Sequence, residues 1–278
     1  MSQKRVEVLM SVMHQDSFDI AHKTKVSSDL LIINQCDQDD YRELEVDGHL
    51  WRMIYTTERG LSKSRNMALK HARGDICLLC DDDEELADGY ADMILRAYGE
   101  LADATAIVFN LNRINVSMKK TYYKIKRVRI APWYRGYGSP MLTFLREQVL
   151  AMGISFDERF GAGSEWGGGE DGLFENAIRH GGRKLYEYPA TIATIDYSNG
   201  SQWFFGYDEK YFYNQGAFNQ IYYRNPLIRL LRKLYTCYKL RRENQLKPMQ
   251  KIHWMNLGAR GITKDVTYQE FLAQQNTD

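Results

Sequence analysis

Short runs of apolar residues, separated by polar segments, organise the first part of this chain. The runs at residues 6–13, 29–34, 49–57, 76–80 and 104–112 have the length and composition of buried strands. Segments with helical spacing and helix-ending signals lie between them, at about residues 17–25, 63–72 and 87–102. Strands that alternate with helices at this spacing form βαβ units. The pattern therefore predicts an α/β fold, with a mainly parallel sheet flanked by helices.

The strand at residues 76–80 is followed at once by four acids, Asp81, Asp82, Asp83 and Glu84. Open parallel sheets bind their ligands beyond the carboxyl ends of the strands. Carboxylates crowded at such an edge repel one another unless a cation lies among them, and oxygen ligands suit Mg²⁺ or Mn²⁺. The acids therefore indicate a metal-held phosphate ligand. A solvated acidic turn before the next helix is the alternative, and the motif alone favours neither interpretation.

Overall charge and length limit the classes of function. The chain of 278 residues has a formal net charge of +1, which argues against a dedicated nucleic-acid-binding protein. The apolar run near the N-terminus is too short for a signal peptide, and no run approaches the ~20 apolar residues of a membrane span. We interpret the four cysteines as buried free thiols of a reducing compartment. We therefore expect a cytoplasmic protein.

A second group of candidate residues closes a glycine-rich loop at residues 160–171. Five glycines in this window allow the backbone to approach a ligand, and the loop also carries Trp166. Glu170 and Asp171 then open a helix that we expect over residues 170–180. Acids are common at helix N-termini for electrostatic reasons alone. A carboxylate at such a loop is also suited to act as a general base, removing a proton from a hydroxyl that attacks as a nucleophile.

Taken in order, these motifs resemble the family-2 glycosyltransferases, which have the GT-A fold. The resemblance covers roughly residues 5–200. It rests on the segment at residues 58–66 (Glu-Arg-Gly-Leu-Ser-Lys-Ser-Arg-Asn), on the acids at residues 81–83 as a DxD motif, and on the Glu-Asp pair at residues 170–171. The resemblance implies an inverting, metal-dependent transfer of a sugar from a nucleotide-diphosphate donor to a hydroxyl of a saccharide or lipid-linked acceptor. Synthesis of a bacterial surface polysaccharide is the process we expect.

The resemblance also implies roles for individual residues. Asp81 would contact the ribose or the donor sugar, and Asp83 would hold Mn²⁺ or Mg²⁺ together with Asp81, with Asp82 assisting. Arg65 would lie against the base or the phosphates, and Trp166 would contribute to donor binding. Asp171 would deprotonate the acceptor hydroxyl, with Glu170 beside it.

The sequence departs from the family in the residues that are expected to bind the nucleotide base. Family members carry acids after the second strand and commonly bind uracil, so a UDP-sugar is the favoured donor. Here the segment at residues 34–36 is Asn-Gln-Cys, and the first acid is Asp37. Either Asp37 is displaced into the role or the amide of Asn34 replaces it, because an amide also bonds a base edge.

The C-terminal part has a different character. From Asn225 the sequence predicts a basic amphipathic helix, in which Leu227, Leu230, Leu231, Leu234 and Tyr238 form an apolar stripe. Such a helix lies on an anionic membrane surface, which would place the protein at the inner face of the cell membrane, or it packs on the catalytic domain. The sequence does not decide between the two. We expect a GT-A catalytic domain at residues 1–222 and a basic extension at residues 223–278.

Two further segments have open interpretations. The basic stretch at residues 119–129 is either an edge strand protected by lysines, which we favour, or a flap over a phosphate ligand. The aromatic residues at 203–213 either line the acceptor side or belong to the core.

Two other functions remain as alternatives to a sugar transferase. A nucleotidyltransferase would need glycine and basic residues directly after the first strand, and residues 13–16 are Met-His-Gln-Asp. An inactive glycosyltransferase-like membrane scaffold would be expected to lose its acids, yet both carboxylate clusters are present.

Overall fold

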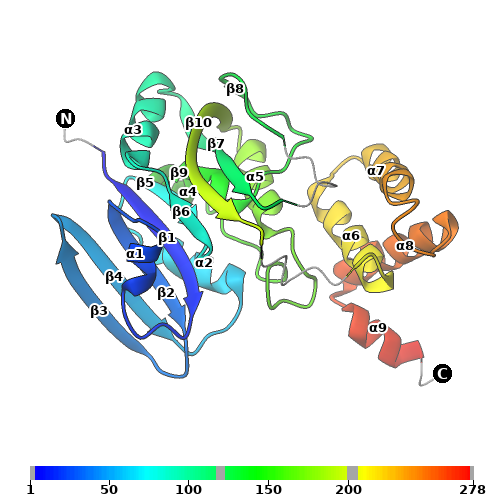
Figure 1. Cartoon of the computed structure of the whole chain (residues 1–278). Helices are drawn as coiled ribbons and strands as arrows, with labels where there is room; N and C mark the ends of the chain where they lie inside the picture. Colours follow the sequence, from blue (N-terminus) through cyan, green and yellow to red (C-terminus); the bar gives the residue numbers. More distant parts are fainter. Residues whose placement is uncertain (1–3, 117–122, 199–205, 276–278) are drawn as a thin grey trace. The chain divides into compact units, whose positions relative to one another are not determined.

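The chain forms two compact units, which are described separately (Figure 1). The computed structural model describes residues 4–116, 123–198 and 206–275. The first unit comprises residues 1–158 and 174–201, and the second comprises residues 159–173 and 202–278. These bounds follow from which residues pack against one another. The division into a catalytic domain at residues 1–222 and an extension at residues 223–278 concerns function and remains a proposal.

The first unit is built on one ten-stranded mixed sheet, in the order β3-β4-β2-β1-β5-β9-β7-β10-β6, with β8 paired to β10. The pairs β1–β2, β1–β5, β2–β4 and β7–β10 are parallel, and β3, β6, β8 and β9 join antiparallel. The strands are β1 (Val6–Met13), β2 (Asp29–Gln35), β3 (Asp40–Val46), β4 (His49–Thr56), β5 (Ile76–Cys80), β6 (Glu84–Leu86), β7 (Ala104–Ile114), β8 (Arg129–Ile130), β9 (Leu142–Leu145) and β10 (Lys184–Asp196).

Helices connect the parallel strands and pack on the sheet, as the alternating pattern predicts. The helical elements of this unit are α1 (Asp19–Lys23), α2 (Leu61–His71), α3 (Tyr90–Glu100), the 3₁₀ turn η1 (Ser139–Met141) and α4 (Arg146–Ala151). Helix α5 (Glu170–His180) begins in the second unit and ends in the first. The five predicted strands and three predicted helices are all present, within a few residues of their expected bounds.

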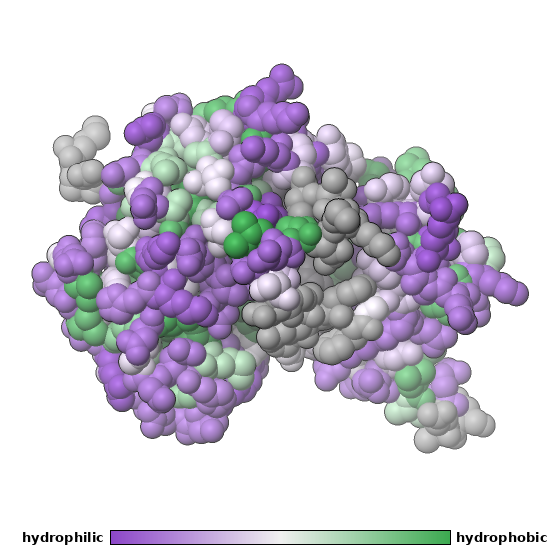
Figure 2. Space-filling model, viewed as in Figure 1, coloured by the Kyte–Doolittle hydropathy of each residue, from purple (hydrophilic) through white to green (hydrophobic). Residues whose placement is uncertain are grey.

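The central strands form the core because their apolar runs are buried on both faces of the sheet. Every residue of β5 is buried, as are most residues of β1 and β2. The edge strand β3 is exposed except for the half-buried Val46, and the surface over it is mostly hydrophilic (Figure 2). Charged side chains on an edge strand discourage pairing with another chain. All four cysteines are free and buried, as expected.

Gly74 allows the connection between α2 and β5 to pass close to strand β1. A Cβ at this position would lie 2.5 Å from the Cβ of Glu7. Glu7 is buried, and its carboxylate pairs with Arg52 at 2.5 Å and accepts hydrogen bonds from the backbone N–H groups of Arg73 and Gly74. A buried charge is tolerated when it is paired and hydrogen-bonded in this way. Gly74 lies in the connection after α2, which ends at His71.

The second unit consists of the glycine-rich loop and four helices: α6 (Glu209–Tyr222), α7 (Pro226–Lys239), α8 (Pro248–Lys264) and α9 (Tyr268–Gln275). In Figure 1 these helices run from yellow to red. Helices α6 and α8 pack very closely, because glycines face the backbone of the partner helix. A Cβ at Gly216 would lie 2.0 Å from the carbonyl oxygen of Met255, and a Cβ at Gly258 would lie 1.8 Å from that of Tyr213.

We expect Gly258→Ala to lower the stability of the second unit, because the new methyl group overlaps the Tyr213 carbonyl and α6 and α8 must separate. Overpacking of this kind costs about 1–3 kcal/mol. Urea unfolding of the full chain measures the loss. The control is Gly99→Ala on α3, where no atom lies within 4 Å of the new Cβ, and a gain of about 0.5–1 kcal/mol is expected there. Equal effects of the two substitutions would contradict the close packing.

Two predicted segments lie partly outside the described residues. Of the basic stretch at residues 119–129, residues 119–122 are not described, and its last residue begins the two-residue strand β8. Of the aromatic group at residues 203–213, residues 203–205 are not described, whereas Phe212 and Tyr213 are buried in the cores of the second unit. Among the described helices, none is both long enough and apolar enough to cross a membrane.

Candidate active site

The carboxyl ends of β1, β2, β4 and β5 lie at one edge of the sheet, because these neighbouring strands are parallel. The register places Met13 beside Gln35, and Gln35 beside Thr56. Four connections therefore leave from the same edge: residues 14–16, 36–39, 57–60 and 81–83. This is where open α/β sheets bind ligands. Most of the candidate residues predicted from the sequence lie on or beside these connections.

The acids after β5 form a tight turn that Glu84 closes. The backbone N–H of Asp81 donates to Oε1 of Glu84 at 2.7 Å, and Glu84 begins the short strand β6. Asp82 and Asp83 are exposed, Asp81 is half-buried, and Glu84 is buried. One carboxylate oxygen from each of Asp81, Asp83 and Glu84 lies within 4.8 Å of the others. The turn therefore gathers three carboxylates at the end of a buried strand.

Electrostatics at this turn favour a cation. Burial, followed by the negative charge of Asp81, raises the pKa of Glu84 well above its usual range. Desolvation of its carboxyl group, followed by the charge of Asp82, raises the pKa of Asp83. Both shifts mean that the clustered carboxylates resist ionising together. A divalent cation relieves that repulsion, as does protonation.

Arg65 supplies positive charge to the same turn. It lies on α2 and is buried, with its guanidinium Nη2 3.3 Å from Oδ1 of Asp81 and 2.7 Å from Oγ of Ser139. Its guanidinium also lies over the ring of Phe156, 5.6 Å from the ring centre. The structure thus brings together two residues, Arg65 and Asp81, that the sequence assigned to donor binding. A fixed guanidinium beside carboxylates is suited to a ligand that carries both phosphate and a cation.

The donor set fits a hard divalent cation. Carboxylate oxygens are the ligands that Mg²⁺ and Mn²⁺ prefer, and three of them are gathered here. The Oε2 atom of Glu84 is buried and has no hydrogen-bond partner among the described residues. A buried acceptor without a partner is uncommon in a folded protein, and a bound ion is one way to satisfy it.

Asn34 orders the loop after the first strand. It is fully buried at the end of β2, where its Oδ1 accepts from the Gln15 backbone N–H at 3.0 Å and its Nδ2 donates to the Gln15 carbonyl at 2.6 Å. Both polar atoms of the amide therefore hold residues 14–16 at the sheet edge. The side chain shapes this part of the site by positioning the loop.

We expect Asn34→Asp to loosen this loop, because a carboxylate would face the Gln15 carbonyl in place of the amide donor. Leaving a buried polar group unpaired costs about 1–3 kcal/mol. The measurement is the free energy of unfolding in urea, together with UDP affinity by calorimetry. The control, for stability alone, is Asp37→Asn, an exposed site at the same edge, where the free energy of unfolding should change by no more than about 0.5 kcal/mol. An Asn34→Asp protein of wild-type stability would contradict the role given to the amide.

Asp37 and its neighbours form a second polar group at this edge. The Asp37 side chain is 88% exposed, and it pairs with Nη2 of Arg59 at 2.6 Å. Arg59 also donates to the carbonyls of Thr56 and Thr57. The side chain of Gln35 accepts from the backbone N–H of Gly60 at 2.7 Å. These bonds fix the connection that leads from β4 into α2, at the start of the segment that carries Arg65.

The glycine-rich loop belongs to the second unit and is closed on itself. The backbone N–H of Gly161 donates to the Gly167 carbonyl at 2.7 Å, and the hydroxyl of Ser164 donates to the Gly161 carbonyl at 2.7 Å. Trp166 is buried and stacks on Tyr213, with ring centres 5.8 Å apart. In this structure Trp166 therefore supports the loop from the core of the second unit.

The loop ends on the acid pair predicted from the sequence. Gly169 has a φ of +132°, and a Cβ there would lie 2.7 Å from the ring of Phe218. Glu170 is buried, and its Oε2 accepts from the Gly169 backbone N–H at 2.9 Å. Asp171 follows on the first turn of α5 and is half-buried. The tight backbone at Gly169 thus places Glu170 inward and leaves Asp171 partly accessible.

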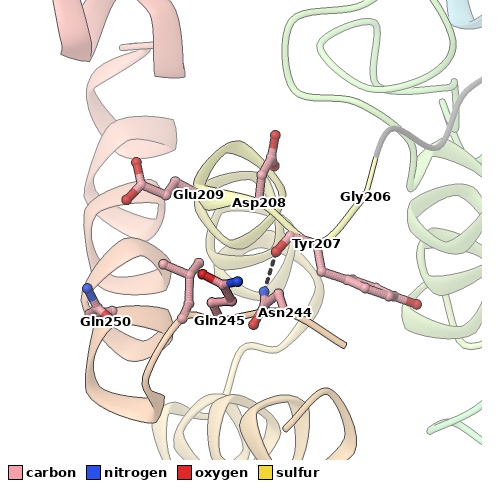
Figure 3. A pocket seen from close by; sticks show the side chains of 8 residues that line it. Gly206, Tyr207, Asp208, Glu209, Asn244, Gln245 and Gln250 are labelled. Atoms are coloured by element: carbon pink, nitrogen blue, oxygen red, sulfur yellow. Dashed lines mark hydrogen bonds between the residues drawn. The ribbon is translucent and has the colours of Figure 1, made fainter. Parts of the chain in front are cut away.

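An open pocket in the second unit has different chemistry (Figure 3). It is lined by Gly206, Tyr207, Asp208, Glu209, Asn244, Gln245, Leu246 and Gln250. None of these lining residues is basic, so the pocket as described offers no positive charge for a diphosphate. The carboxylate of Asp208 already caps α6 by accepting from the Tyr211 backbone N–H, and Asn244 donates to the Tyr207 carbonyl. We assign no ligand to this pocket.

Three residues that shape the site were not singled out from the sequence. Glu84 was seen only as part of an acidic run, although its position at the end of that run was the available signal. Arg59 pairs with Asp37 across two separate loops, and Ser139 pairs with Arg65 from 74 residues away. Contacts between distant segments leave no local pattern that the sequence could reveal.

Comparison with known proteins agrees with this geometry. The model of Glycosyl transferase family 2 matches residues 7–163. Among solved structures, S. aureus TarS 1–349 in complex with UDP-GlcNAc superimposes with a TM-score of 0.58 at 12% identity, covering 93% of this chain and 73% of that one. A second crystal structure of S. aureus TarS 1–349 gives a TM-score of 0.60 at 13% identity, covering 93% of this chain and 80% of that one.

The structure of TarS given without residue limits matches with a TM-score of 0.55 at 12% identity, and this match covers 44% of its length. At these identities the likeness shows the GT-A fold alone, which confirms the predicted fold class. No curated protein sequence matches the chain. The family match covers more than half of the chain. The chain therefore belongs to glycosyltransferase family 2, and it is a glycosyltransferase.

Proposed function

We propose that this protein is an inverting, metal-dependent glycosyltransferase that moves a sugar from a nucleotide-diphosphate donor to a hydroxyl of a saccharide or lipid-linked acceptor. The observation that carries the proposal is the turn after β5, where the oxygens of Asp81, Asp83 and Glu84 lie within 4.8 Å of one another beside Arg65. A UDP-sugar is the favoured donor, and TarS, with the same fold, has been crystallised with UDP-GlcNAc and with UDP. Synthesis of a bacterial surface polysaccharide is the proposed process.

The residues of the acidic turn would bind the donor. Asp83 and Asp81 would hold Mn²⁺ or Mg²⁺, with Asp82 assisting, and Asp81 would also contact the ribose or the donor sugar. When bound, the cation supplies Lewis-acid chemistry at the diphosphate. Arg65 is held by Asp81 and Ser139, so its guanidinium would meet phosphate charge with little loss of conformational freedom.

Other candidate residues would recognise the nucleotide. Asp37 is exposed at the sheet edge and is available to a base or ribose, while Asn34 would contribute through the loop that it holds. A direct contact between Trp166 and the donor stays a prediction, since the structure places its ring in the core of the second unit.

Asp171 would act as the general base. Its carboxylate would accept the proton of the acceptor hydroxyl while that oxygen attacks the anomeric carbon. The bond between the anomeric carbon and the diphosphate oxygen breaks, and its electron pair leaves with the diphosphate. Attack from the face opposite the leaving group inverts the configuration. Glu170 would position the turn through its bond to the Gly169 N–H.

The test is turnover with defined donors. The protein is incubated with Mn²⁺ and UDP-GlcNAc, UDP-glucose or UDP-galactose, with alkyl glycosides as acceptors, and release of UDP and formation of product are followed. We expect one donor to be consumed with a product of opposite anomeric configuration by NMR. Retention of configuration would overturn the inverting mechanism. Release of pyrophosphate from a nucleoside triphosphate and a sugar phosphate would indicate a nucleotidyltransferase instead.

A further inference from the structure

Helix α7 of the second unit exposes its apolar face. The predicted stripe of leucines does not pack on the protein: the exposed fractions are 61% for Leu227, 50% for Leu230, 56% for Leu231 and 48% for Leu234. Tyr235 and Tyr238 continue the same face with 51% and 65%. Figure 2 shows hydrophobic surface over α7 next to hydrophilic surface. A contiguous apolar face of this kind on a helix marks an interaction surface.

The orientation of α7 is fixed by the side that packs. Thr236 and Cys237 are buried against the unit, and the buried Lys251 of α8 donates to the carbonyl of Leu240 at the end of α7 at 2.8 Å. Lys233 donates to the side chain of Asn256 on α8 at 2.6 Å. The helix therefore turns Ile228, Thr236 and Cys237 toward its own unit and its leucines away from it. This arrangement is the reverse of that in an ordinary surface helix.

Within residues 224–242, which cover α7 and its immediate flanks, the charged side chains are all of one sign. Residues 224–242 contain seven basic side chains and no acidic one. Lys239, Arg241 and Arg242 are exposed at the C-terminal end, and Arg224 is exposed before the helix. The guanidinium of Arg241 lies over the ring of Tyr238, 4.3 Å from its centre. Leucines with tyrosines on one face and flanking cations are the composition of helices that lie in the interface of an anionic bilayer.

We propose that the exposed face of α7 docks this protein on an anionic phospholipid bilayer. The leucines would enter the boundary between headgroups and acyl chains, the tyrosines would sit at headgroup level, and the basic residues would contact lipid phosphates. A second copy of this chain is a poorer occupant, because a symmetric contact through α7 would bring two segments with seven positive charges together. The inference goes beyond sugar transfer and does not depend on the identity of the donor.

Sedimentation of the full chain with vesicles tests the proposal. The vesicles are phosphatidylcholine alone and phosphatidylcholine mixed with phosphatidylglycerol. We expect binding to the mixed vesicles that weakens with salt, and much weaker binding to phosphatidylcholine. The double variant Leu230→Glu/Leu234→Glu should lower binding by roughly 100-fold or more, since two apolar side chains no longer enter the bilayer. The double variant Arg241→Gln/Arg242→Gln should lower binding to the anionic vesicles by roughly 30-fold.

Matched controls separate this face from the rest of the surface. Leu44→Glu/Leu150→Glu changes two exposed leucines of the first unit, and Lys70→Gln/Arg96→Gln changes two exposed cations there. Both should bind vesicles like the wild type. The substituted α7 leucines are exposed, so circular dichroism and thermal melting should show folded protein. Absence of binding to the anionic vesicles, or binding unaffected by the α7 substitutions, would overturn the proposal. A dimer in light scattering that the leucine variant abolishes would assign the face to a second copy instead.

Discussion

Replacing Asp171 by asparagine is expected to lower the rate of sugar transfer by roughly 100- to 10,000-fold, the usual contribution of a general base. The amide has almost the same shape as the carboxylate but cannot accept the proton of the acceptor hydroxyl. We expect the new side chain at residue 171 to keep its place on the first turn of α5, because the hydrogen bond between Glu170 and Gly169 holds this turn. The rate of UDP release in the presence of acceptor measures the effect.

The matched control for Asp171 is Glu165→Gln, an exposed acid on the same glycine-rich loop. It removes one negative charge from the loop and should leave the rate within about twofold of the wild type, as an exposed substitution away from the chemistry. The Asp171→Asn protein should still bind UDP with unchanged affinity. Wild-type turnover by Asp171→Asn would contradict the assignment of the base. Loss of UDP binding together with turnover would show instead that Asp171 belongs to the donor site.

The second large effect is expected from Asp83→Asn. This change removes one of the three carboxylates of the acidic turn and weakens the hold on a divalent cation. Lewis-acid stabilisation of a leaving phosphate is worth several kcal/mol, so a loss of about 4 kcal/mol, or roughly 1000-fold in kcat/KM, is expected. Turnover should be measured over a range of Mn²⁺ concentrations, with a partial recovery at high Mn²⁺.

Asp88→Asn is the control for Asp83→Asn. Asp88 is an exposed acid shortly after the turn and before α3, and it is absent from the carboxylate cluster. This substitution should leave the Mn²⁺ dependence of turnover unchanged. If Asp83→Asn kept the Mn²⁺ dependence of the wild type, the cation would not be held at this turn.

The strands predicted from the sequence are those with a longer apolar run, whereas the four-residue strand β9 was missed although it is buried. Strand β5 is a continuous apolar run, and all of it is buried. Strand β3 has no buried face, so its charged sequence gave no signal. Strand β10 contains Pro189, and its pairing with β7 shifts register between Glu187 and Thr191. A proline at an irregularity of this kind breaks the alternation on which a strand is recognised.

The part of the candidate site that directly follows a single strand could be predicted from the sequence. The acids at residues 81–84 are adjacent in sequence, so their clustering follows from the turn alone. The ion pair between Arg59 and Asp37 and the hydrogen bond between Arg65 and Ser139 depend on how distant loops meet. The burial of Trp166 depends on its stacking with Tyr213, which lies 47 residues further along the chain. Tertiary packing therefore decides which polar and aromatic residues face a ligand.

The sequence also did not reveal whether the apolar stripe on α7 faces the protein or the solvent. Its helical spacing was correctly predicted, and α7 begins at Pro226, directly after its N-cap Asn225. An amphipathic pattern normally turns its apolar side inward. Here the bonds from Lys251 to the Leu240 carbonyl and from Lys233 to the Asn256 side chain hold the helix in the opposite sense.

A thermal-shift series shows whether the acidic turn after β5 is the donor site. UDP, GDP, CDP and dTDP are each added with and without Mn²⁺ to the wild type and to Asp83→Asn. A nucleotide present at 100 times its Kd stabilises a protein by about 2.7 kcal/mol, which is readily measured. We expect UDP with Mn²⁺ to stabilise the wild type, and we expect this stabilisation to be lost without Mn²⁺ or in Asp83→Asn. Stabilisation by no nucleotide, or equal stabilisation of both proteins, would contradict this assignment of the donor site.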